Sequence, residues 1–520
     1  MTTVGQALVA GLAARGVDTV FGIPGVHTIE LYRGLAGSGL RHVTARHEQG
    51  AAFMADGYAR ASGRPGVAFV ITGPGVTNAL TAMAQARADS VPMLVVSGVN
   101  RRATLGRGMG HLHELPDQAA MVGAVCPSFL VEGPEVLGAR LDAAFAAMTA
   151  GRPGPVHLAV PLDVMGLPCA ALPAPLAPSA PAAPEAAALE AALALMGRAR
   201  APVILAGGGC ARARGALAAL AEALDAPVVQ TVNARGLMHG HALTVAASPS
   251  LGAVRALIGA ADAVLAVGTE LGPTDYDMYG TGGMPDLSGM IRVDICAAQL
   301  ARHPAAVTIR ADAGVSLAAL AVRVVPRRGD GAARAAAART AAWAELTPEM
   351  QAQVAVLEAI RDALPGARIV GDSTQPVYAG NLFFDADRPG GWFNAATGFG
   401  ALGYGPGAAI GAALGAPGVP VVCLTGDGGL GFTAAELRTA VDEGADVTFV
   451  VWNNAGFREI AESMVAAGAE VIGCAPSPLR MEPLAAACDL PFVRVPPAPD
   501  ALRAALSGGC GPRMVEIVVG

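Results

Sequence analysis

The chain has 520 residues and a formal net charge of −7, and all 35 of its basic residues are arginine. A chain of this length predicts about three domains. The absence of lysine excludes a Schiff-base lysine and the lysine of a phosphate-binding P-loop. The acidic balance argues against a surface that binds nucleic acid. With 67 glycines, 38 prolines and 53% hydrophobic residues, the composition is typical of a globular protein with many short turns.

The eight cysteines are scattered and form no C-x-x-C pair, so the sequence predicts neither a zinc site nor a redox pair. The N-terminus lacks the charged and apolar regions of a signal peptide. No uninterrupted apolar stretch reaches the roughly 20 residues that a membrane span needs. We therefore expect a cytoplasmic protein that binds neither membranes nor nucleic acid.

Short apolar and β-branched runs alternate with alanine-rich segments along the whole chain. Such runs, followed by turns that contain glycine, are typical of buried parallel strands in βαβ units. They form three blocks of similar size, which predicts an α/β protein with three doubly wound parallel-sheet domains. Proline-rich and polar stretches between the blocks are typical of linkers. The predicted domains are 1–166, 187–325 and 350–520, the linkers 167–186 and 326–338, and the main strands 67–72, 93–98, 202–208, 226–231, 263–268, 290–295, 368–372, 419–429, 447–454 and 514–519.

The strongest chemical pattern lies in the third block. An apolar strand ends in Gly-Asp-Gly-Gly at 426–429, and the next apolar strand ends in Asn453 and Asn454, followed by Ala-Gly-Phe. Loops at the carboxyl ends of parallel strands line the binding crevice of such a sheet. A carboxylate, an amide oxygen and a backbone carbonyl are the hard ligands that Mg²⁺ prefers beside phosphate oxygens. The start of the following helix favours an anion. The pattern therefore predicts a magnesium–diphosphate site.

This segment resembles the diphosphate-binding motif of thiamine-diphosphate enzymes, which begins with GDG and ends with NN. Asn454 follows Asp427 by 27 residues, the separation between the Asp and Asn metal ligands in that family. The resemblance implies that Asp427, Asn454 and the carbonyl of Gly456 hold Mg²⁺. It also implies that the residues around them contact the diphosphate: Ser373, Thr374, Gln375, Gly426, Gly428, Gly429 and Phe457.

A second pattern, ARHEQGAAFMADGYAR at 45–60, places Glu48 at the start of a predicted helix. An acid in this position ordinarily complements the helix dipole. The family carries a glutamate before a small-residue helix that ends in ADGYAR, and Glu48 matches it. By this resemblance, the Glu48 carboxyl shares a proton with a pyrimidine nitrogen of thiamine diphosphate, so that the neighbouring amine can remove the thiazolium proton.

Three glycine-rich segments extend the resemblance. In GFGALGYG, starting at Gly398, the family match implies that the Gly400 carbonyl and the Leu402 side chain orient the cofactor; the alternative is the dinucleotide fingerprint G-x-G-x-x-G, which lacks its acidic partner here. FGIPG at 21–25 and TGPGVTN at 72–78 resemble two loops that contact the pyrimidine. They imply cofactor contacts for Pro24, Gly25 and Asn78.

The domain order matches the acetolactate-synthase and 2-oxo-acid-decarboxylase branch of the family. In that family the cofactor lies between two subunits, which implies a homodimer or tetramer. The central loop at 267–280 lacks the arginine of flavin-binding synthases, and Arg212 replaces the third glycine of a dinucleotide fingerprint. We therefore expect no FAD. His111 and His113 could relay protons in catalysis, or they could simply belong to a polar loop.

Three functions stay open: decarboxylation of a small 2-oxo acid, an acetolactate-synthase-like carboligation, and a dinucleotide-dependent oxidation. The segments 21–35, 46–51 and 112–116 look most like those of 5-guanidino-2-oxopentanoate decarboxylases. A guanidinium tail favours a carboxylate partner, which it can bind with two parallel hydrogen bonds. The candidate partners, each of which could also be an ordinary surface acid, are Glu114, Asp117, Asp275, Asp277 and Glu459.

Overall fold

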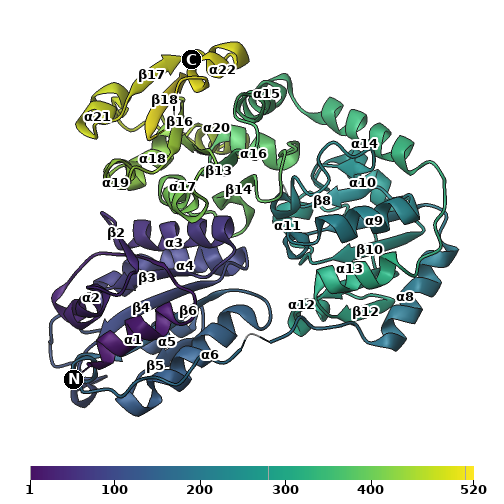
Figure 1. Ribbon diagram of the computed structural model, residues 1–520. Coiled ribbons are helices and arrows are strands. Elements are labelled where there is room, and N and C mark those ends of the chain that lie inside the picture. The colour runs from purple at the N-terminus through teal and green to yellow at the C-terminus, as the bar shows by residue number, and fades with distance from the viewer. Residues whose placement is uncertain (1, 178, 279, 510, 520) are drawn as a thin grey trace.

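A computed structural model describes residues 2–177, 179–278, 280–509 and 511–519. Pro178 of the first predicted linker, Tyr279 of the 267–280 loop and Cys510 lie outside the described residues. These described residues form three sheets of six parallel strands each, flanked by helices (Figure 1). This confirms the predicted class of three parallel-sheet α/β domains.

The first sheet has the strand order β2-β1-β3-β4-β6-β5. The chain runs from β1 outward to β2 and then returns to the other side of β1, so the order reverses between β1 and β3. Its strands are β1 Thr19–Gly22, β2 Arg41–Thr44, β3 Gly66–Val70, β4 Met93–Val99, β5 Ser128–Leu130 and β6 Pro155–Pro161. Its helices are α1 Val4–Ala13, α2 Ile29–Leu35, α3 Glu48–Ser62, α4 Pro74–Ala88, α5 Gln118–Gly123, α6 Leu137–Thr149 and α7 Leu162–Met165.

The third sheet repeats this arrangement, with the order β14-β13-β15-β16-β18-β17. The predicted strand 419–429 ends earlier than expected, because a helix begins at Asp427. The strands are β13 Arg368–Gly371, β14 Trp392–Asn394, β15 Val421–Gly426, β16 Val447–Asn453, β17 Phe492–Val495 and β18 Arg513–Val518. The helices are α15 Pro348–Ala363, α16 Gln375–Leu382, α17 Tyr404–Gly415, α18 Asp427–Thr433, α19 Glu436–Asp442, α20 Arg458–Ala466, α21 Met481–Ala487 and α22 Pro499–Leu506.

The central sheet differs, with the order β12-β11-β10-β7-β8-β9. Part of the predicted second linker is the start of α14, because its alanine run favours a helix. The strands are β7 Pro202–Ala206, β8 Val228–Gln230, β9 Thr244–Val245, β10 Ala263–Val267, β11 Ile291–Asp294 and β12 Val307–Arg310. The helices are α8 Ala186–Arg198, α9 Arg214–Leu224, α10 Gly252–Gly259, α11 Pro273–Tyr276, α12 Ala297–Leu300, α13 Ala313–Ala321 and α14 Gly331–Glu345.

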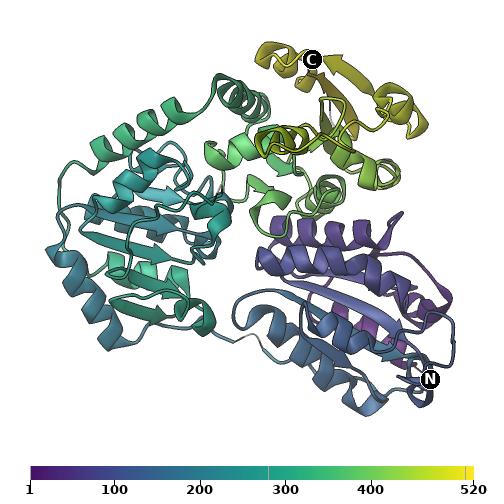
Figure 2. The same ribbon diagram turned by 180° about the vertical axis from the view of Figure 1, so that it is seen from behind.

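Helices α3 and α17 join the first and third domains, and they lie against each other in the two opposite views (Figures 1 and 2). Their backbones approach too closely for side chains at two glycines. A Cβ on Gly57 would lie 1.8 Å from the Ala408 carbonyl oxygen, and one on Gly411 would lie 1.9 Å from that of Met54. Apolar residues of both domains form one buried cluster around this crossing, so the two domains share a core.

Asp89, at the end of α4, lies where the three domains meet. Its carboxylate accepts hydrogen bonds from Asn233 of the central domain at 3.2 Å and from Thr397 of the third domain at 2.8 Å. It also pairs with the buried Arg60 of α3 at 2.7 Å. Because a buried carboxylate is stable only when it is paired and hydrogen-bonded, this contact fixes how the domains sit together.

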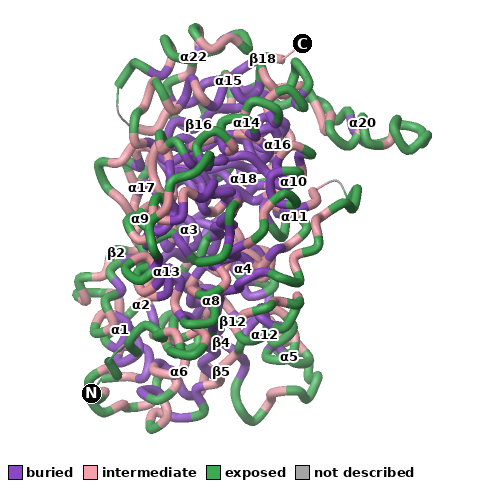
Figure 3. The backbone as a smooth tube through the Cα atoms, turned by 90° about the vertical axis from the view of Figure 1, so that its right-hand side faces the viewer, coloured by how far each residue is buried: buried purple, intermediate pink, exposed green. Residues whose placement is uncertain are grey.

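Most of the backbone around these contacts is buried, whereas α20 projects from the body and is exposed (Figure 3). Among the residues that the structure describes, no helix is long and apolar enough to cross a membrane.

Candidate active site

The predicted diphosphate-binding residues all follow strands of the third sheet at one edge. β13, β15 and β16 are neighbours in register, with Gly371 beside Leu424 and Gly426 beside Trp452. The residues after each strand therefore converge. Ser373, Thr374 and Gln375 follow β13, residues 427–429 follow β15, which ends at Gly426, and residues 454–457 follow β16.

The three predicted metal ligands lie together at this edge. The Asn454 amide nitrogen donates to Gln375 Oε1 at 3.1 Å. Its carbonyl oxygen is thereby turned toward the Gly456 carbonyl oxygen, at 2.9 Å, and toward Asp427 Oδ1, at 3.2 Å.

Three oxygens that face one another without a donor between them repel. Turning the Asn454 amide over would convert both short contacts into hydrogen bonds. A cation among the oxygens favours the orientation that places the amide oxygen inward instead. Oxygens that share an octahedral Mg²⁺ at about 2.0–2.1 Å lie about 2.9 Å apart. The donor set therefore fits a magnesium ion.

Helix α18 begins at Asp427, so this carboxyl group lies in the first turn. Burial raises the pKa of Asp427, and backbone N–H groups, including that of Asn454, oppose the shift. A bound cation would oppose it further, because an adjacent positive charge favours the carboxylate. The neighbouring Ala455 has a φ of 58°, a left-handed conformation that costs energy for a residue with a Cβ. Such strain is typical of backbone held in place at a functional site.

The segment that starts at Gly398 forms a loop between β14 and α17. Gly400 has a φ of 77° and faces open space, and Leu402 is half-buried beside it. A Cβ on Gly398 would lie 2.7 Å from Ala88 Cβ, and one on Gly403 would lie 2.7 Å from Phe432 Cβ. These two glycines therefore pack against protein and do not leave the backbone open to a pyrophosphate.

The residues before this loop include the short strand β14, Trp392–Asn394. A 3-10 turn, Ala395–Thr397, separates β14 from the glycines. A dinucleotide fingerprint requires the glycines to follow the strand directly, so the local structure argues against that alternative.

In the first domain, Glu48 is the first residue of α3. The side chain of Asn78, on α4, donates to Glu48 Oε2 at 3.0 Å. The sequence predicted both residues as cofactor contacts but not their hydrogen bond. Pro24 and Gly25 follow β1 and line a hollow of about 530 Å³ together with Val26, Ile29, Tyr32 and Arg33. The pyrimidine loops and Glu48 thus lie at the carboxyl ends of β1, β2 and β3.

Glu436, which the sequence analysis missed, reaches this region from the third domain. Its carboxylate accepts from the backbone N–H groups of Arg46 and His47, at 3.0–3.2 Å, and from the Thr439 hydroxyl at 2.8 Å. Burial raises the pKa of Glu436, and these hydrogen bonds oppose the shift. Only its place within an apolar stretch of the sequence, TAAELRTAV, could have signalled a buried acid.

Comparison with protein families identifies the family to which the domains that carry these two sets of loops belong. Models of the thiamine pyrophosphate enzymes match all three domains: the N-terminal TPP binding domain at residues 2–121, the central domain at 189–320 and the C-terminal TPP binding domain at 372–517. The chain belongs to the thiamine pyrophosphate enzymes. Its cofactor is therefore thiamine diphosphate.

Curated relatives of this thiamine pyrophosphate enzyme include two kinds of protein. The "Probable 2-ketoarginine decarboxylase AruI" of Pseudomonas aeruginosa is 46% identical over 91% of this chain and 86% of its own length. The acetolactate synthase large subunit of Parasynechococcus marenigrum is 33% identical over 86% of this chain and 75% of its own. The large subunit of acetolactate synthase isozyme 1 of Escherichia coli is 30% identical over 86% of this chain and 81% of its own length.

The two predicted relay histidines occupy different surroundings in this thiamine pyrophosphate enzyme. His111 is exposed, and its backbone N–H donates to Glu114 at 2.9 Å. His113 is half-buried, and its ring lies 5.1 Å from that of His27. The catalytic role of both side chains stays a prediction. His27 was missed, because its position beside His113 depends on the fold.

Four of the five candidate acids already have structural partners. Glu114 accepts from three backbone N–H groups of its own loop, and Asp117 caps α5. Asp275 accepts from the Val232 N–H, and burial raises its pKa to about 6. Asp277 pairs with Arg255. The side chain of Glu459, in the first turn of α20, makes no hydrogen bond or ion pair with the other residues that the structure describes.

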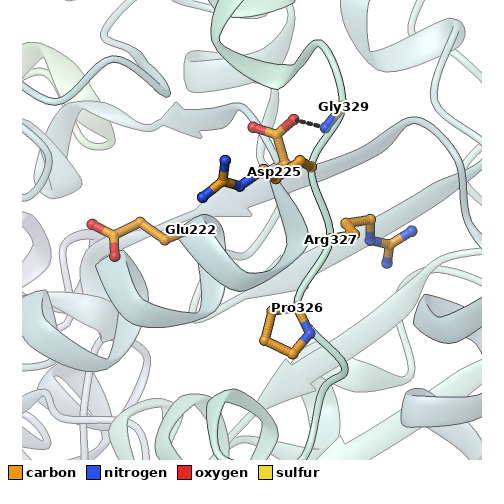
Figure 4. A pocket seen from close by; sticks show the side chains of 6 residues that line it. Glu222, Asp225, Pro326, Arg327 and Gly329 are labelled. Atoms are coloured by element: carbon orange, nitrogen blue, oxygen red, sulfur yellow. Dashed lines mark hydrogen bonds between the residues drawn. The ribbon is translucent and has the colours of Figure 1, made fainter.

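A second hollow, of about 500 Å³, lies in the central domain (Figure 4). Glu222, Asp225 and the chain from Pro326 to Gly329 line it. The Gly329 N–H donates to Asp225 at 2.7 Å, which holds the segment before α14 against the end of α9. None of the predicted site residues lies there.

Proposed function

We propose that this enzyme decarboxylates a 2-oxo acid, and that its substrate is 5-guanidino-2-oxopentanoate, also called 2-ketoarginine. The relative named as a probable 2-ketoarginine decarboxylase, which is 46% identical over 91% of this chain, carries the proposal. The presence of Glu48, Asp427 and Asn454 supports an active member of the family.

The two edges of the site would have separate roles. Asp427, Asn454 and the Gly456 carbonyl would hold Mg²⁺, and through it the diphosphate. Glu48, oriented by Asn78 at 3.0 Å, would hold the proton that activates the cofactor. When bound, thiamine diphosphate supplies a carbon nucleophile and stores the electron pair released with CO₂. The chain's own residues would bind and orient the cofactor, and they would move protons.

We further propose that Glu459 binds the guanidinium tail. Glu459 is exposed on α20, and the negative charges of Glu462 and Glu349 near it would attract a cationic group to this part of the molecule. The charge of Glu459 in turn raises the pKa of Tyr378 on α16. That helix begins at Gln375, which directly contacts Asn454. Glu459 therefore lies on the side of the diphosphate edge.

A homodimer or tetramer follows from the same proposal. In this family the pyrimidine edge of one subunit and the diphosphate edge of another enclose one cofactor. This chain carries both edges, so two copies would form two complete sites.

We also expect the central domain to bind no FAD. The glycines that would approach a dinucleotide are used for packing, since a Cβ on Gly207 would lie 2.2 Å from the Gly268 carbonyl oxygen and one on Gly209 would lie 2.7 Å from Gly268 Cα. The absorption spectrum of the purified protein, before and after denaturation, checks this expectation. A flavin spectrum would contradict it and favour a synthase-like enzyme.

A panel of substrates tests the function. The enzyme, loaded with thiamine diphosphate and Mg²⁺, is offered pyruvate, a branched 2-oxo acid, benzoylformate and 5-guanidino-2-oxopentanoate. We expect the highest kcat/KM for the guanidino acid, with aldehyde and CO₂ as products. The Glu459→Gln variant should raise KM for the guanidino acid and leave pyruvate kinetics unchanged. A preference for pyruvate with acetolactate as the product would contradict the proposal and support the synthase alternative.

A further inference from the structure

A buried carboxylate of the third domain contacts the backbone directly before Glu48. Glu436, the first residue of α19, is completely buried. Its carboxylate accepts from the backbone N–H groups of Arg46 at 3.1 Å and of His47 at 3.0 Å. Taking a carboxylate out of water is costly even when it is hydrogen-bonded, so a buried acid in this position calls for an explanation.

The carboxylate packs against the first turn of α3 so closely that only a glycine can face it. A Cβ on Gly50 would lie 2.1 Å from Glu436 Oε1 and 2.6 Å from its Cδ. Thr439, about one turn further along α19, donates to the other oxygen, Oε2, at 2.8 Å. Both oxygens therefore have partners, which hold the side chain in one orientation. Backbone N–H groups at the start of a helix are favourable partners for a carboxylate.

The side chains of the turn before Glu48 give it weaker support than Glu436 does. Arg46 and His47 are both exposed. Arg46 pairs with Asp442 of α19 at the surface, and exposed ion pairs contribute little to stability. The His47 ring accepts from the Gln49 N–H at 3.1 Å, a contact within α3 itself. The buried carboxylate of Glu436 is therefore the contact that ties this turn firmly to the third domain.

Glu48 follows this turn directly, so its place depends on how the turn is held. It is the first residue of α3, and the Asn78 side chain donates to its Oε2 at 3.0 Å. The side chain of Glu48 is thus held from α4, and the backbone before it is held through Glu436. An acid that shares a proton with a bound group must be placed accurately, because a displacement of about 1 Å can cost about 10²-fold in rate.

We propose that Glu436 is a positioning residue for Glu48. By accepting the two N–H groups of the preceding turn, it holds the Glu48 carboxyl group where it can reach the pyrimidine nitrogen of the cofactor. Glu436 acts through these hydrogen bonds and not through a proton of its own. The inference rests on the role proposed above for Glu48. Helix α19 follows α18 after only two residues, and α18 begins at Asp427, so one segment of the chain serves both the proposed metal ligand and Glu48.

Three variants of the full chain separate hydrogen bonding from charge. Glu436→Ala removes the acceptor of both N–H groups. Glu436→Gln removes the charge but keeps an amide oxygen, which can accept both N–H groups as Oε1 does. Asp442→Ala is the matched control, because Asp442 lies on the same helix and contacts the same Arg46, but only through the exposed side chain.

The first measurement is hydrogen–deuterium exchange of the backbone amides before any cofactor is added. Mass spectrometry of peptides that cover residues 46–50 follows it. We expect the N–H groups of Arg46 and His47 to exchange faster in Glu436→Ala, because they lose their acceptor and the turn opens more often. In Glu436→Gln and Asp442→Ala they should exchange at the wild-type rate.

The second measurement is exchange of the thiazolium C2 proton in enzyme saturated with thiamine diphosphate and Mg²⁺. Glu436→Ala should slow it by about 10²-fold. Glu436→Gln should restore most of the wild-type rate, and Asp442→Ala should not change it. Gly50→Ala, whose methyl group displaces the carboxylate, should also slow exchange. Combined with Glu436→Ala it should add little, because the atoms that the methyl group meets are then gone.

C2-proton exchange at the wild-type rate in Glu436→Ala would overturn the proposal. A Glu436→Gln variant as slow as Glu436→Ala would also overturn it, because the charge of Glu436 and not its hydrogen bonds would then matter. If Glu436→Ala does not fold, the wild-type rate in Gly50→Ala has the same consequence. A wild-type rate in Glu48→Gln would instead refute the role proposed for Glu48, and this inference with it.

Discussion

The first and third domains have the same strand order but present different chemistry at the same edge. In each, the second strand lies outermost, followed by the first, third, fourth, sixth and fifth strands of the domain. In each, the loops after the first four strands carry the candidate site residues. The first domain offers groups that can gain or lose a proton, namely Glu48, His27 and His113. The third domain offers oxygen ligands for a cation, namely Asp427, Asn454 and the Gly456 carbonyl.

The comparison separates what topology decides from what residue identity decides. Helices α3 and α17 follow the second strand of their domains and pack against each other with mutual glycine contacts. The repeated topology therefore determines where loops converge and how the two domains meet. The side chains at the strand ends determine that one edge handles protons and the other holds a metal.

The largest effect is expected from the proton-handling edge. Glu48→Gln should still bind thiamine diphosphate, because the diphosphate edge is intact. It should slow exchange of the thiazolium C2 proton by about 10²–10⁴-fold, the range for loss of acid–base catalysis. Hydrogen–deuterium exchange of the bound cofactor, followed by NMR, measures this rate. An exchange rate equal to that of the wild type would remove Glu48 from this role.

At the metal-binding edge we expect a loss of cofactor affinity, which Glu48→Gln should keep. Asp427→Asn keeps the shape of the side chain but removes its charge. Loss of one partner of a buried charged contact costs about 2–5 kcal/mol, which is about 30- to 4000-fold in cofactor affinity. Calorimetric titration with thiamine diphosphate and Mg²⁺ measures the loss. Asp442→Asn, an exposed acid of the same domain, is the control, and unchanged affinity in Asp427→Asn would exclude it as a ligand.

In the first sheet and in the third sheet, one polar residue bridges the last three strands. These two residues allow a comparison of pH dependence. His157 of β6 contacts Ser97 of β4 and Ser128 of β5, both at 2.8 Å. Glu516 of β18 contacts Asn453 of β16 at 2.6 Å and Arg494 of β17 at 2.7 Å. Complete burial lowers the pKa of His157 from 6.5 to about 4.

Unfolded histidine binds a proton below about pH 6.5, whereas folded His157 stays neutral until about pH 4. Its contribution to the free energy of unfolding is therefore complete above pH 6.5 and falls by about 3 kcal/mol as the pH drops to 4. His157→Gln should flatten this part of the stability curve in denaturant titrations. His111 is exposed, so His111→Gln should leave it unchanged. An equally steep curve in both variants would show that another group causes the acid sensitivity.

The smallest effect is expected where the two domains meet. Gly57→Ala adds a methyl group that would lie 1.8 Å from the Ala408 carbonyl oxygen, so α3 and α17 must separate slightly. Overpacking of this kind typically costs about 1–3 kcal/mol, measurable as a lower thermal unfolding temperature. The control is Gly197→Ala on α8, where nothing lies within 4 Å of the added Cβ. A wild-type unfolding temperature in Gly57→Ala would contradict the close helix contact.

Several features of the fold could not be predicted from a segment's own residues, because they also depend on the segments that pack beside it. The sequence analysis identified neither the two-residue strand β9 nor the partly exposed β5 and β12, because such strands depend on pairing more than on apolar runs. It also extended β15 through the glycines that start α18.

What the sequence determined by itself was the class of fold and the family, and it predicted the residues of the two edges. Strand ends, residue types and the spacing from Asp427 to Asn454 are local properties of the chain, and a parallel sheet brings strand ends together wherever it forms. The tertiary structure alone decided which side chains touch. Glu436 reaches the start of α3 because α17 packs on α3, and His27 meets His113 because β3, which pairs with both β1 and β4, brings the loops after those two strands together. These contacts join segments far apart in the chain, and the packing of whole elements, not the local sequence, determines them.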